Sequence, residues 1–257
     1  MPIPILTPMF ASGALQFAFE KSTTEGKITI SVLLILSLFS WTVILTKFRQ
    51  LAIARRWSKR FLEAYAATRD PLEIKRGGVG FDGAPAFHLY VRGAEELEYH
   101  LKHNPKESNG QVRVSTGAFE AVKVTLEEAA AAEAMALEKG MIVLSTAVAG
   151  GPFIGLLGTV WGVMETFAGI AKANSASLTA MAPGVAGALI ATVVGLLVAI
   201  PAMFAYNFMV STVRSITQEL DGFAARYATQ IDHAYVENRN LEEKIADALV
   251  RAGVSPQ

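Results

Sequence analysis

The stretch GPFIGLLGTVWGVMETF, residues 151–167, decides the fold of this chain. It is apolar and rich in glycine, and its single charged residue is Glu165. A buried strand with a turn, a glycine-rich nucleotide loop and a membrane helix are the alternatives. Most of the stretch lies in the uncharged run 140–164. That run is long enough to cross a bilayer, which takes about 20 residues in a helix. We therefore interpret it as part of a membrane helix.

Two further uncharged runs, 28–46 and 173–213, also have the length of a membrane span. The composition agrees, because 52% of the 257 residues are hydrophobic and only 18% are charged, against about 25% charged in soluble domains. The sequence thus predicts an all-α membrane protein with three transmembrane helices in contact with membrane lipid. No basic residue precedes Lys21, which argues against a cleavable signal peptide.

Basic residues set the expected orientation, since lysine and arginine gather in cytoplasmic loops. Six of them lie within 47–60, directly after the first run, whereas the connection between the other two runs holds only Lys172. We expect both the N-terminal segment and that connection outside the cytoplasm. The predicted segments are an outer segment 1–27, a first span 28–47, a cytoplasmic helical domain 48–138, a second span 139–170, an outer loop 171–180, a third span 181–211, and a cytoplasmic C-terminal helix and tail 212–257.

The cytoplasmic parts are expected to be long helical extensions of the spans. Ser22 and Glu25 have the spacing of a capping box at the start of the first helix. After a glycine- and proline-rich break, a helix near 86–103 and a polar linker NPKESNGQ, residues 104–111, follow. Strong helix formers follow, without a proline or clustered glycines before Gly150-Gly151-Pro152. They predict one continuous helix from about 117 to 170. The third span is expected to continue as a helix to about residue 248.

Several function classes are disfavoured. A net charge of zero argues against a nucleic-acid binder, and a chain without cysteine has no disulfides and no thiolate metal site. The glycines of GGPFIGLLG lack the strand and acidic residue of a dinucleotide site. His100 and His103 have a conceivable metal spacing but no adjoining ligands, and a solvated helix face is the simpler interpretation. We therefore predict a protein that is not an enzyme and has no catalytic residues, metal or cofactor.

Small residues form a stripe on each of the last two spans. The stripe on the second span comprises Gly155, Thr159, Gly162 and Thr166, and that on the third comprises Gly184, Ala188, Thr192, Gly195 and Ala199. The members stand at i, i+4, i+7 and i+11 on the second span and at i, i+4, i+8, i+11 and i+15 on the third, which places each stripe on one helix face. Such faces let membrane helices approach closely. Two interpretations stay open: the stripes only pack helices together, or Thr159 and Thr192 also face a narrow polar path.

Glu165 lies beside the stripe of its helix, about 60° from Gly162 and about 120° from Thr159. A carboxylate in a membrane segment is costly and usually faces a cavity or a partner. Its place near the outer end of the span favours a polar rim over direct proton handling.

The motifs GLLGTVWG, APGVAGALIAT and AIPAMFAYN resemble those of the MotA/TolQ/ExbB proton-channel family, and specifically its ExbB/TolQ branch. The resemblance is strong over about 150–208. It implies a homopentamer in the bacterial inner membrane, with the N-terminus in the periplasm and the C-terminus in the cytoplasm. It further implies that the pentamer encloses a one-span ExbD/TolR-like partner, with a TonB-like protein as a further partner, and uses the proton motive force for biopolymer transport or envelope work.

The same resemblance implies roles for single residues. The channel threonines of the family map onto Thr159 and Thr192, with Gly155, Gly162, Thr166, Ala188 and Gly195 beside them along the pathway. One departure stands out: Gly187 occupies a position where well-known ExbB proteins have glutamate. This favours an aspartate of the partner as the titrating group. A flagellar-type stator subunit, which usually has four spans, and a passive membrane scaffold remain the alternatives.

Overall fold

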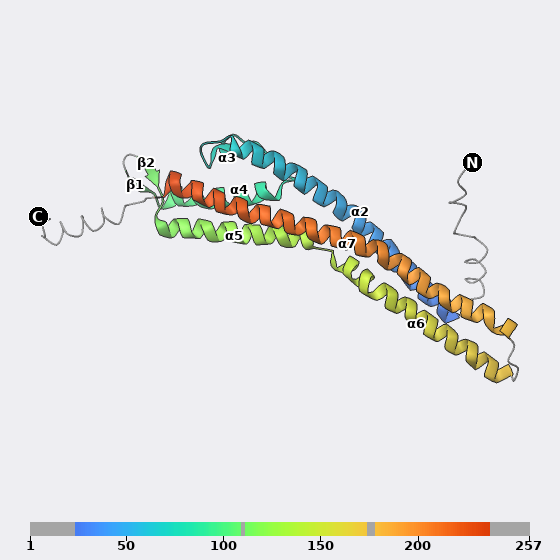
Figure 1. The fold of residues 1–257 in the computed structure, drawn as a ribbon. Coiled ribbons are helices and arrows are strands. Elements are labelled where there is room, and N and C mark those ends of the chain that lie inside the picture. The colour runs from blue at the N-terminus through green and yellow to red at the C-terminus, as the bar shows by residue number, and fades with distance from the viewer. Residues whose placement is uncertain (1–23, 109–110, 174–177, 237–257) are drawn as a thin grey trace, which may run out of the picture. The chain divides into compact units, whose positions relative to one another are not determined.

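The computed structural model describes residues 24–108, 111–173 and 178–236, and these form a helical chain with one small hairpin (Figure 1). Three helical stretches are long and apolar enough to cross a membrane: Thr24–Ala66, Thr116–Lys172 and Met181–Tyr235. Ser22, half of the expected capping box, lies outside the described residues. The helix that it was expected to cap, α2, spans Thr24–Ala66.

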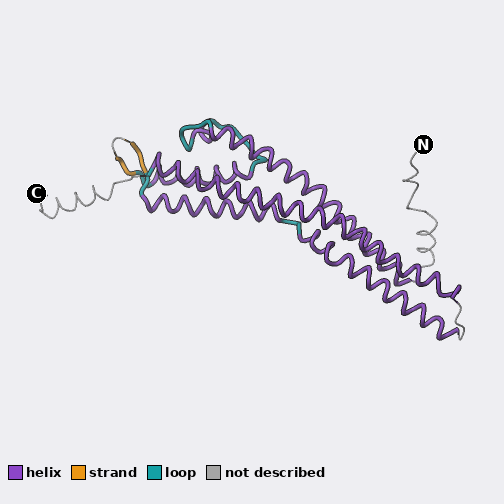
Figure 2. The backbone as a smooth tube through the Cα atoms, viewed as in Figure 1, coloured by secondary structure: helices purple, strands orange, loops and turns teal. Residues whose placement is uncertain are grey.

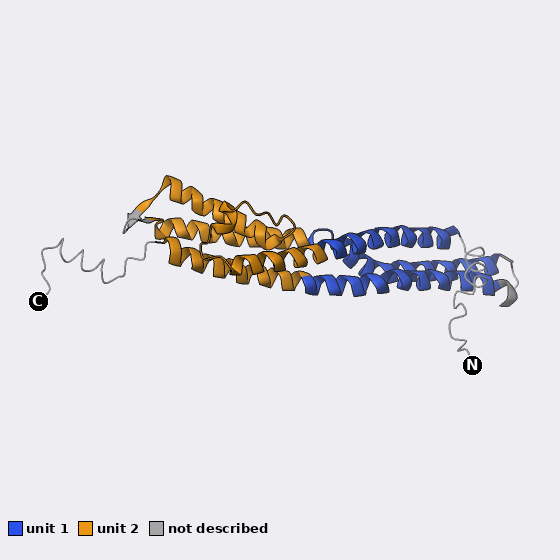
Figure 3. Cartoon of the chain, turned by 90° about the horizontal axis from the view of Figure 1, so that it is seen from above, with its two compact units in different colours: residues 1–50, 138–212 blue, residues 51–137, 213–257 orange. Residues whose placement is uncertain are grey.

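The chain divides into two compact units, coloured separately in Figure 3. Unit 1 comprises residues 1–50 and 138–212, and unit 2 comprises 51–137 and 213–257. The helices α2 (Thr24–Ala66) and α7 (Leu178–Tyr235) contribute residues to both units. The helix α6 (Ile142–Ala173) belongs to unit 1.

Unit 1 exposes large apolar side chains on each of its helices. Leu38 of α2 is 70% exposed, Phe153 of α6 is 72% exposed and Phe204 of α7 is 67% exposed. Monomeric soluble proteins rarely expose contiguous apolar surface of this kind. The exposed faces therefore fit contact with lipid or with other membrane helices.

Unit 2 packs helices around an aromatic core. Its own helices are α3 (Glu73–Arg76), α4 (Pro85–His103) and α5 (Thr116–Glu138). The C-terminal parts of α2 and α7 complete the unit. The α4 bounds confirm the helix expected near 86–103. The rings of Phe61 and Phe223 meet edge to face at 5.4 Å, and Tyr90 and Tyr227 are fully buried beside them. These aromatic side chains bury the large apolar area that holds the unit together.

The expected polar linker is instead a β-hairpin. Strands β1 (Lys106–Ser108) and β2 (Gln111–Arg113) pair antiparallel, with Lys106 opposite Arg113; they are the orange segments of Figure 2. The sequence between them is Asn109-Gly110, a dipeptide typical of two-residue hairpin turns. Directly after β2, the backbone N–H of Val114 donates to the carbonyl of Tyr235 at 2.8 Å, which ties the hairpin to the end of α7.

The prediction of one helix from 117 to 170 is wrong at a single place. The chain forms α5 (Thr116–Glu138) and α6 (Ile142–Ala173), separated at Lys139–Met141. Gly140 has φ +88° there, a left-handed conformation that glycine adopts without steric cost and that ends helices. At Gly150-Gly151-Pro152 the helix α6 continues through all three residues, as the prediction of a continuous helix required. Membrane helices tolerate an internal proline when neighbouring groups satisfy the freed carbonyl.

The third long helix, α7, ends at Tyr235. The expected continuation to about residue 248 falls largely on residues outside those that the structure describes. At this end, Asp70 accepts hydrogen bonds from the Tyr235 hydroxyl at 2.7 Å and from the backbone N–H of Leu72 at 2.9 Å. Arg76 completes the cluster with an ion pair to Asp70 at 2.6 Å. Residues from two distant parts of the chain are thus joined within unit 2.

The electrostatics of this cluster favour the ionised carboxylate. Burial acts to raise the pKa of Asp70, but hydrogen bonds from Leu72 and Tyr235 and the charge of Arg76 outweigh burial, so this pKa lies below its ordinary value. The pKa of the Tyr235 hydroxyl is raised by burial and by its bond to Asp70. Asp70 therefore remains a hydrogen-bond acceptor at neutral pH.

Candidate functional site

The predicted small-residue stripes meet each other within unit 1, between α6 and α7. A Cβ added to Gly155 would lie 2.8 Å from the carbonyl oxygen of Ala191, and one added to Gly162 would lie 2.7 Å from Cβ of Ala188. From the other helix, a Cβ added to Gly195 would lie 2.5 Å from the carbonyl oxygen of Gly151. The two backbones therefore touch where glycine and alanine line the stripes, as expected for close packing in lipid.

The three predicted threonines use their hydroxyls in different ways. Thr192 of α7 donates to the carbonyl of Gly155 on α6 at 3.1 Å, so it bonds across the helix pair. Thr166 donates to Gly162 of its own helix at 2.8 Å and lies against Gly184. Thr159 donates to Leu156 of its own helix at 2.7 Å.

These contacts bear on the two interpretations of the stripes. Helix packing accounts for Gly155, Gly162, Ala188 and Gly195, which are all buried between α6 and α7. It does not account fully for Thr159, whose side chain is only half-buried and whose hydroxyl bonds within its own turn. A place for Thr159 and Thr192 along a proton pathway stays a prediction.

Thr29 of α2 also contacts this site and was not singled out from the sequence. A Cβ added to Gly158 would lie 2.5 Å from Cβ of Ala191 and 3.1 Å from the methyl carbon of Thr29. Thr29 is buried, and its hydroxyl donates to the carbonyl of Glu25 at 2.8 Å. No periodic stripe surrounds Thr29 in the sequence, so only the fold identifies it as a contact of α2 with the pair α6–α7.

The two acidic positions of interest differ in burial. Glu165 lies on the exposed side of α6, beside the buried stripe, whereas Gly187 is buried in α7. A buried carboxylate at Gly187, as the family resemblance would place it, is thus absent from this chain. The polar-rim role of Glu165 stays a prediction.

The histidines considered for metal binding make local contacts. His100 lies 3.2 Å from a carboxylate oxygen of Glu96, one turn earlier, and a ring nitrogen of His103 lies 2.9 Å from the carbonyl oxygen of Tyr99. Among the described residues, no group of three histidine, aspartate or glutamate side chains has the arrangement of a metal site.

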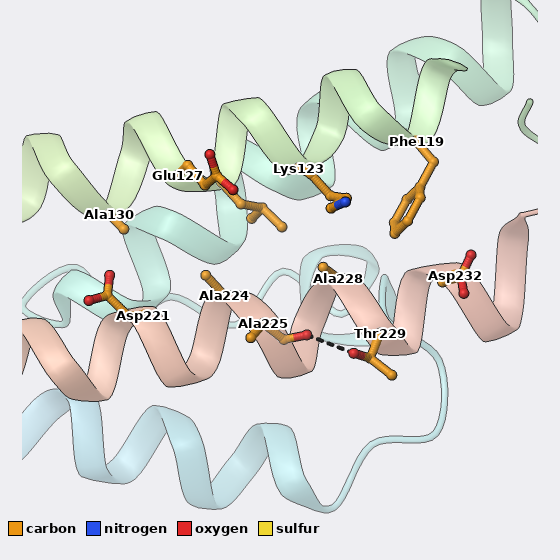
Figure 4. Close-up of a pocket in the computed structure, with 11 residues that line it drawn as sticks. Phe119, Lys123, Glu127, Ala130, Asp221, Ala224, Ala225, Ala228, Thr229 and Asp232 are labelled. Atoms are coloured by element: carbon orange, nitrogen blue, oxygen red, sulfur yellow. Dashed lines mark hydrogen bonds between the residues drawn. The ribbon is translucent and has the colours of Figure 1, made fainter. Parts of the chain in front are cut away.

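A separate hollow of about 510 Å³ lies in unit 2 between α5 and α7. Figure 4 shows its alanine-rich wall on α7 and the side chains that face it from α5. The Thr229 hydroxyl in this wall donates to its own helix, at the Ala225 carbonyl. The lining residues are Phe119, Lys123, Leu126, Glu127, Ala130, Asp221, Ala224, Ala225, Ala228, Thr229 and Asp232.

Comparison with known proteins gives consistent matches. The MotA/TolQ/ExbB proton channel family matches residues 96–222, which include every predicted site residue. The chain is 30% identical over 215 residues to the Tol-Pal system protein TolQ of Haemophilus influenzae, covering 82% of this chain and 90% of the relative. It is 33% identical over 240 residues to the biopolymer transport protein ExbB of Pseudomonas putida, covering 91% and 68%. It is also 34% identical over 200 residues to ExbB of Xanthomonas campestris, covering 72% and 78%.

Proposed function

Because this chain belongs to the MotA/TolQ/ExbB proton channel family, in its ExbB/TolQ branch, we propose that it is a subunit of a proton-driven motor in the bacterial inner membrane. Five copies form the channel and enclose the membrane helix of a one-span ExbD/TolR-like partner. Proton flow through this assembly moves the partner and powers biopolymer transport or envelope work, with a TonB-like protein as a further partner. The N-terminus lies in the periplasm and the C-terminus in the cytoplasm.

The observation that carries the proposal is the hydroxyl-bearing contact of α6 with α7 inside a largely apolar unit. Thr192 and Thr159 each donate their single hydroxyl hydrogen to a backbone carbonyl. A hydroxyl oxygen has two lone pairs besides its O–H donor. Both oxygens can therefore accept a hydrogen bond from water or from a protonated carboxyl group, which a proton pathway requires.

The titrating group of this pathway comes from the partner. Gly187 supplies no carboxylate at the buried position where the resemblance places one, and Glu165 lies on the exposed side of α6. An aspartate in the partner's membrane helix would gain and lose the proton. Thr159 and Thr192 would orient the water or carboxyl group that carries it, and Gly155, Gly162, Thr166, Ala188 and Gly195 would hold α6 and α7 at the distance that this needs.

The test is proton flux into vesicles that contain this chain with and without its one-span partner. Thr159→Val and Thr192→Val should each reduce partner-dependent flux to the partner-free background, while Thr159→Ser and Thr192→Ser, which keep the hydroxyl, should retain it. Thr46→Val is the matched control, since Thr46 also bonds to its own helix, at Thr42, but lies on the exposed side of α2. Native mass measurement should give five copies for every variant.

The outcomes separate the proposal from its alternatives. Full flux in both valine variants would disprove the hydroxyl role while leaving the motor intact. A complex of one copy, or no flux with any one-span partner, would favour a passive scaffold.

A further inference from the structure

The part of α2 that follows its apolar run carries a strip of basic residues. No acidic residue lies among them in the sequence. Arg49, Arg55, Arg56, Lys59 and Arg60 form this strip, and the first acidic residue after them is Glu63. All five side chains are exposed. This positive charge is local, because the chain as a whole has a net charge of zero.

The strip is separate from the packing face of the same helix. Leu51, Ala54, Ser58 and Phe61 are buried and form the opposite side of α2. At 100° per residue, Arg49, Arg56, Lys59 and Arg60 fall within an arc of about 100°. These four basic side chains therefore point away from the helices that α2 packs against. Arg55 lies at the edge of the strip, about 40° from Leu51.

Little within the chain neutralises the strip. Lys59 lies 3.9 Å from Glu63, and both side chains are more than two-thirds exposed, so the pair contributes little. Over the part of the chain that the structure describes, Arg49, Arg55, Arg56 and Arg60 form no ion pair within 4 Å. The Arg60 guanidinium lies 5.3 Å from the ring centre of Trp57, an aromatic residue type that favours the membrane–water interface.

The direction of α2 brings these charges towards the membrane. Helical side chains tilt towards the N-terminus of their helix, and α2 runs from its apolar part towards the strip. Arg55 and Arg56 lie about 13–15 Å along the helix from Thr46, at 1.5 Å per residue. An extended arginine reaching back by several ångströms comes within a Debye length, about 8–10 Å, of the headgroup layer. Lys59 and Arg60 add to the same field one turn further on.

We propose that this strip binds the headgroups of anionic phospholipids in the membrane that the protein crosses. The inference goes beyond the motor function and does not depend on proton flux. Three observations favour anionic lipid: the strip is positively charged, its side chains are exposed, and it follows the apolar run of α2 directly. Basic clusters directly after a membrane helix commonly recognise anionic lipid in this way.

The experiment uses the full chain purified in detergent micelles that contain equimolar phosphatidylglycerol and phosphatidylcholine, with mass spectrometry of the lipids that remain bound. The wild type should retain phosphatidylglycerol over phosphatidylcholine by about fivefold or more, since one basic side chain near an anionic surface contributes a factor of about five. The variant R55Q/R56Q/K59Q/R60Q should bring this ratio close to that of the bulk micelle.

Two further variants test whether the charge of the strip causes the preference for phosphatidylglycerol. R69Q/R92Q/K102Q/R226Q removes the same number of exposed basic residues elsewhere in unit 2 and should leave the lipid ratio unchanged. R55K/R56K/R60K keeps the charge and should keep the ratio within about twofold, because a headgroup phosphate is held mainly by charge.

Other results would overturn the proposal. These are a wild type without lipid preference, a strip variant that keeps the preference, and a control variant that loses it. If the glutamine strip variant does not fold, as judged by circular dichroism, the wild type in 0.5 M salt replaces it. Screening should then reduce the preference, and a preference that salt leaves unchanged would disprove headgroup binding by charge.

Discussion

At Gly155, α6 and α7 leave no room for a side chain. The nearest groups to an added Cβ are the backbone of Ala191 and of Thr192, which cannot rotate away as a flexible side chain can. Gly155→Ala should therefore destabilise the detergent-solubilised protein by about 1–3 kcal/mol, the usual cost of overpacking. The measurement is the thermal unfolding midpoint.

Gly169→Ala is the matched control for this substitution. Gly169 belongs to the same helix, but nothing lies within 4 Å of a Cβ added there. Alanine at that position should be neutral or stabilising, since it favours helix by about 1 kcal/mol over glycine. Equal losses in the two variants would show that the close contact at Gly155 is unimportant.

Asp70 gives the stability of unit 2 a defined pH dependence. The pKa of Asp70 is lower in the folded protein than its ordinary value of about 3.9. Its contribution is therefore complete above about pH 5 and is lost as the pH falls through the folded-state pKa. The difference in unfolding midpoint between the wild type and Asp70→Asn should shrink between about pH 5 and pH 3.

Two variants support this interpretation of Asp70. Tyr235→Phe removes one of the hydrogen bonds to the carboxylate and should remove part of the pH dependence. Glu95→Gln, at an exposed site on α4, should follow the wild type throughout. A constant difference between wild type and Asp70→Asn from pH 6 to pH 3 would contradict the assignment.

Among the helices, the break between α5 and α6 depends on one residue. Gly140 has φ +88°, and a Cβ added there would meet only Cε of Lys47, at 3.8 Å. The cost of Gly140→Ala is therefore conformational and should be about 1–2 kcal/mol. Gly140→Asn should cost less, because asparagine tolerates this conformation. Unfolding midpoints should follow that order.

Gly117→Ala provides the comparison on α5. Nothing lies within 4 Å of a Cβ added at Gly117, which is in the first turn of the helix, so this variant should be as stable as the wild type or more so. A Gly140→Ala protein of wild-type stability would mean that the left-handed turn is not required.

The elements that the sequence predicted well are those with a long, uniform signal. The run 28–46 and most of the described residues of 140–164 and 173–213 lie in membrane-length helices, because an apolar run of about 20 residues without charge is typical of a membrane span. The family was likewise recognisable from three ordered motifs, because α6 and α7 carry them in continuous segments.

The missed features depend on single residues or on tertiary contacts. Gly140 resembles a tolerated helix glycine, and only its left-handed backbone shows that it separates α5 from α6. The stripe spacing placed Thr192 on a face, but periodicity does not reveal the opposite residue, so its bond to Gly155 was not predictable. The dipeptide Asn109-Gly110 is typical of a hairpin turn, but the polar residues around it led to the prediction of a linker.

For the whole molecule, the orientation in the membrane is the main prediction still to be measured. The chain contains no cysteine, so single cysteines can be introduced without removing native ones. Lys172→Cys should react with a membrane-impermeant maleimide in spheroplasts, because that end of α6 is expected in the periplasm. Glu95→Cys, on α4, should react only after lysis. Both positions are exposed.

Leu38→Cys serves as the control for accessibility, since Leu38 is in the apolar part of α2 and is expected to contact lipid. It should react poorly under both conditions. Labelling of Glu95→Cys in intact spheroplasts, with Lys172→Cys protected, would reverse the proposed orientation while leaving the three spans intact.

The break at Gly140 also has an electrostatic consequence. Two separate helices have two macrodipoles, and the C-terminal end of α5 carries about half a negative charge. Lys47 is only 8% exposed. It reaches the position beside Gly140 and donates to Gln50 at 2.8 Å. A continuous helix would present no carbonyl end at that point. The left-handed glycine therefore creates a partial negative charge beside a buried ammonium group, where the membrane segment of α2 gives way to its basic continuation.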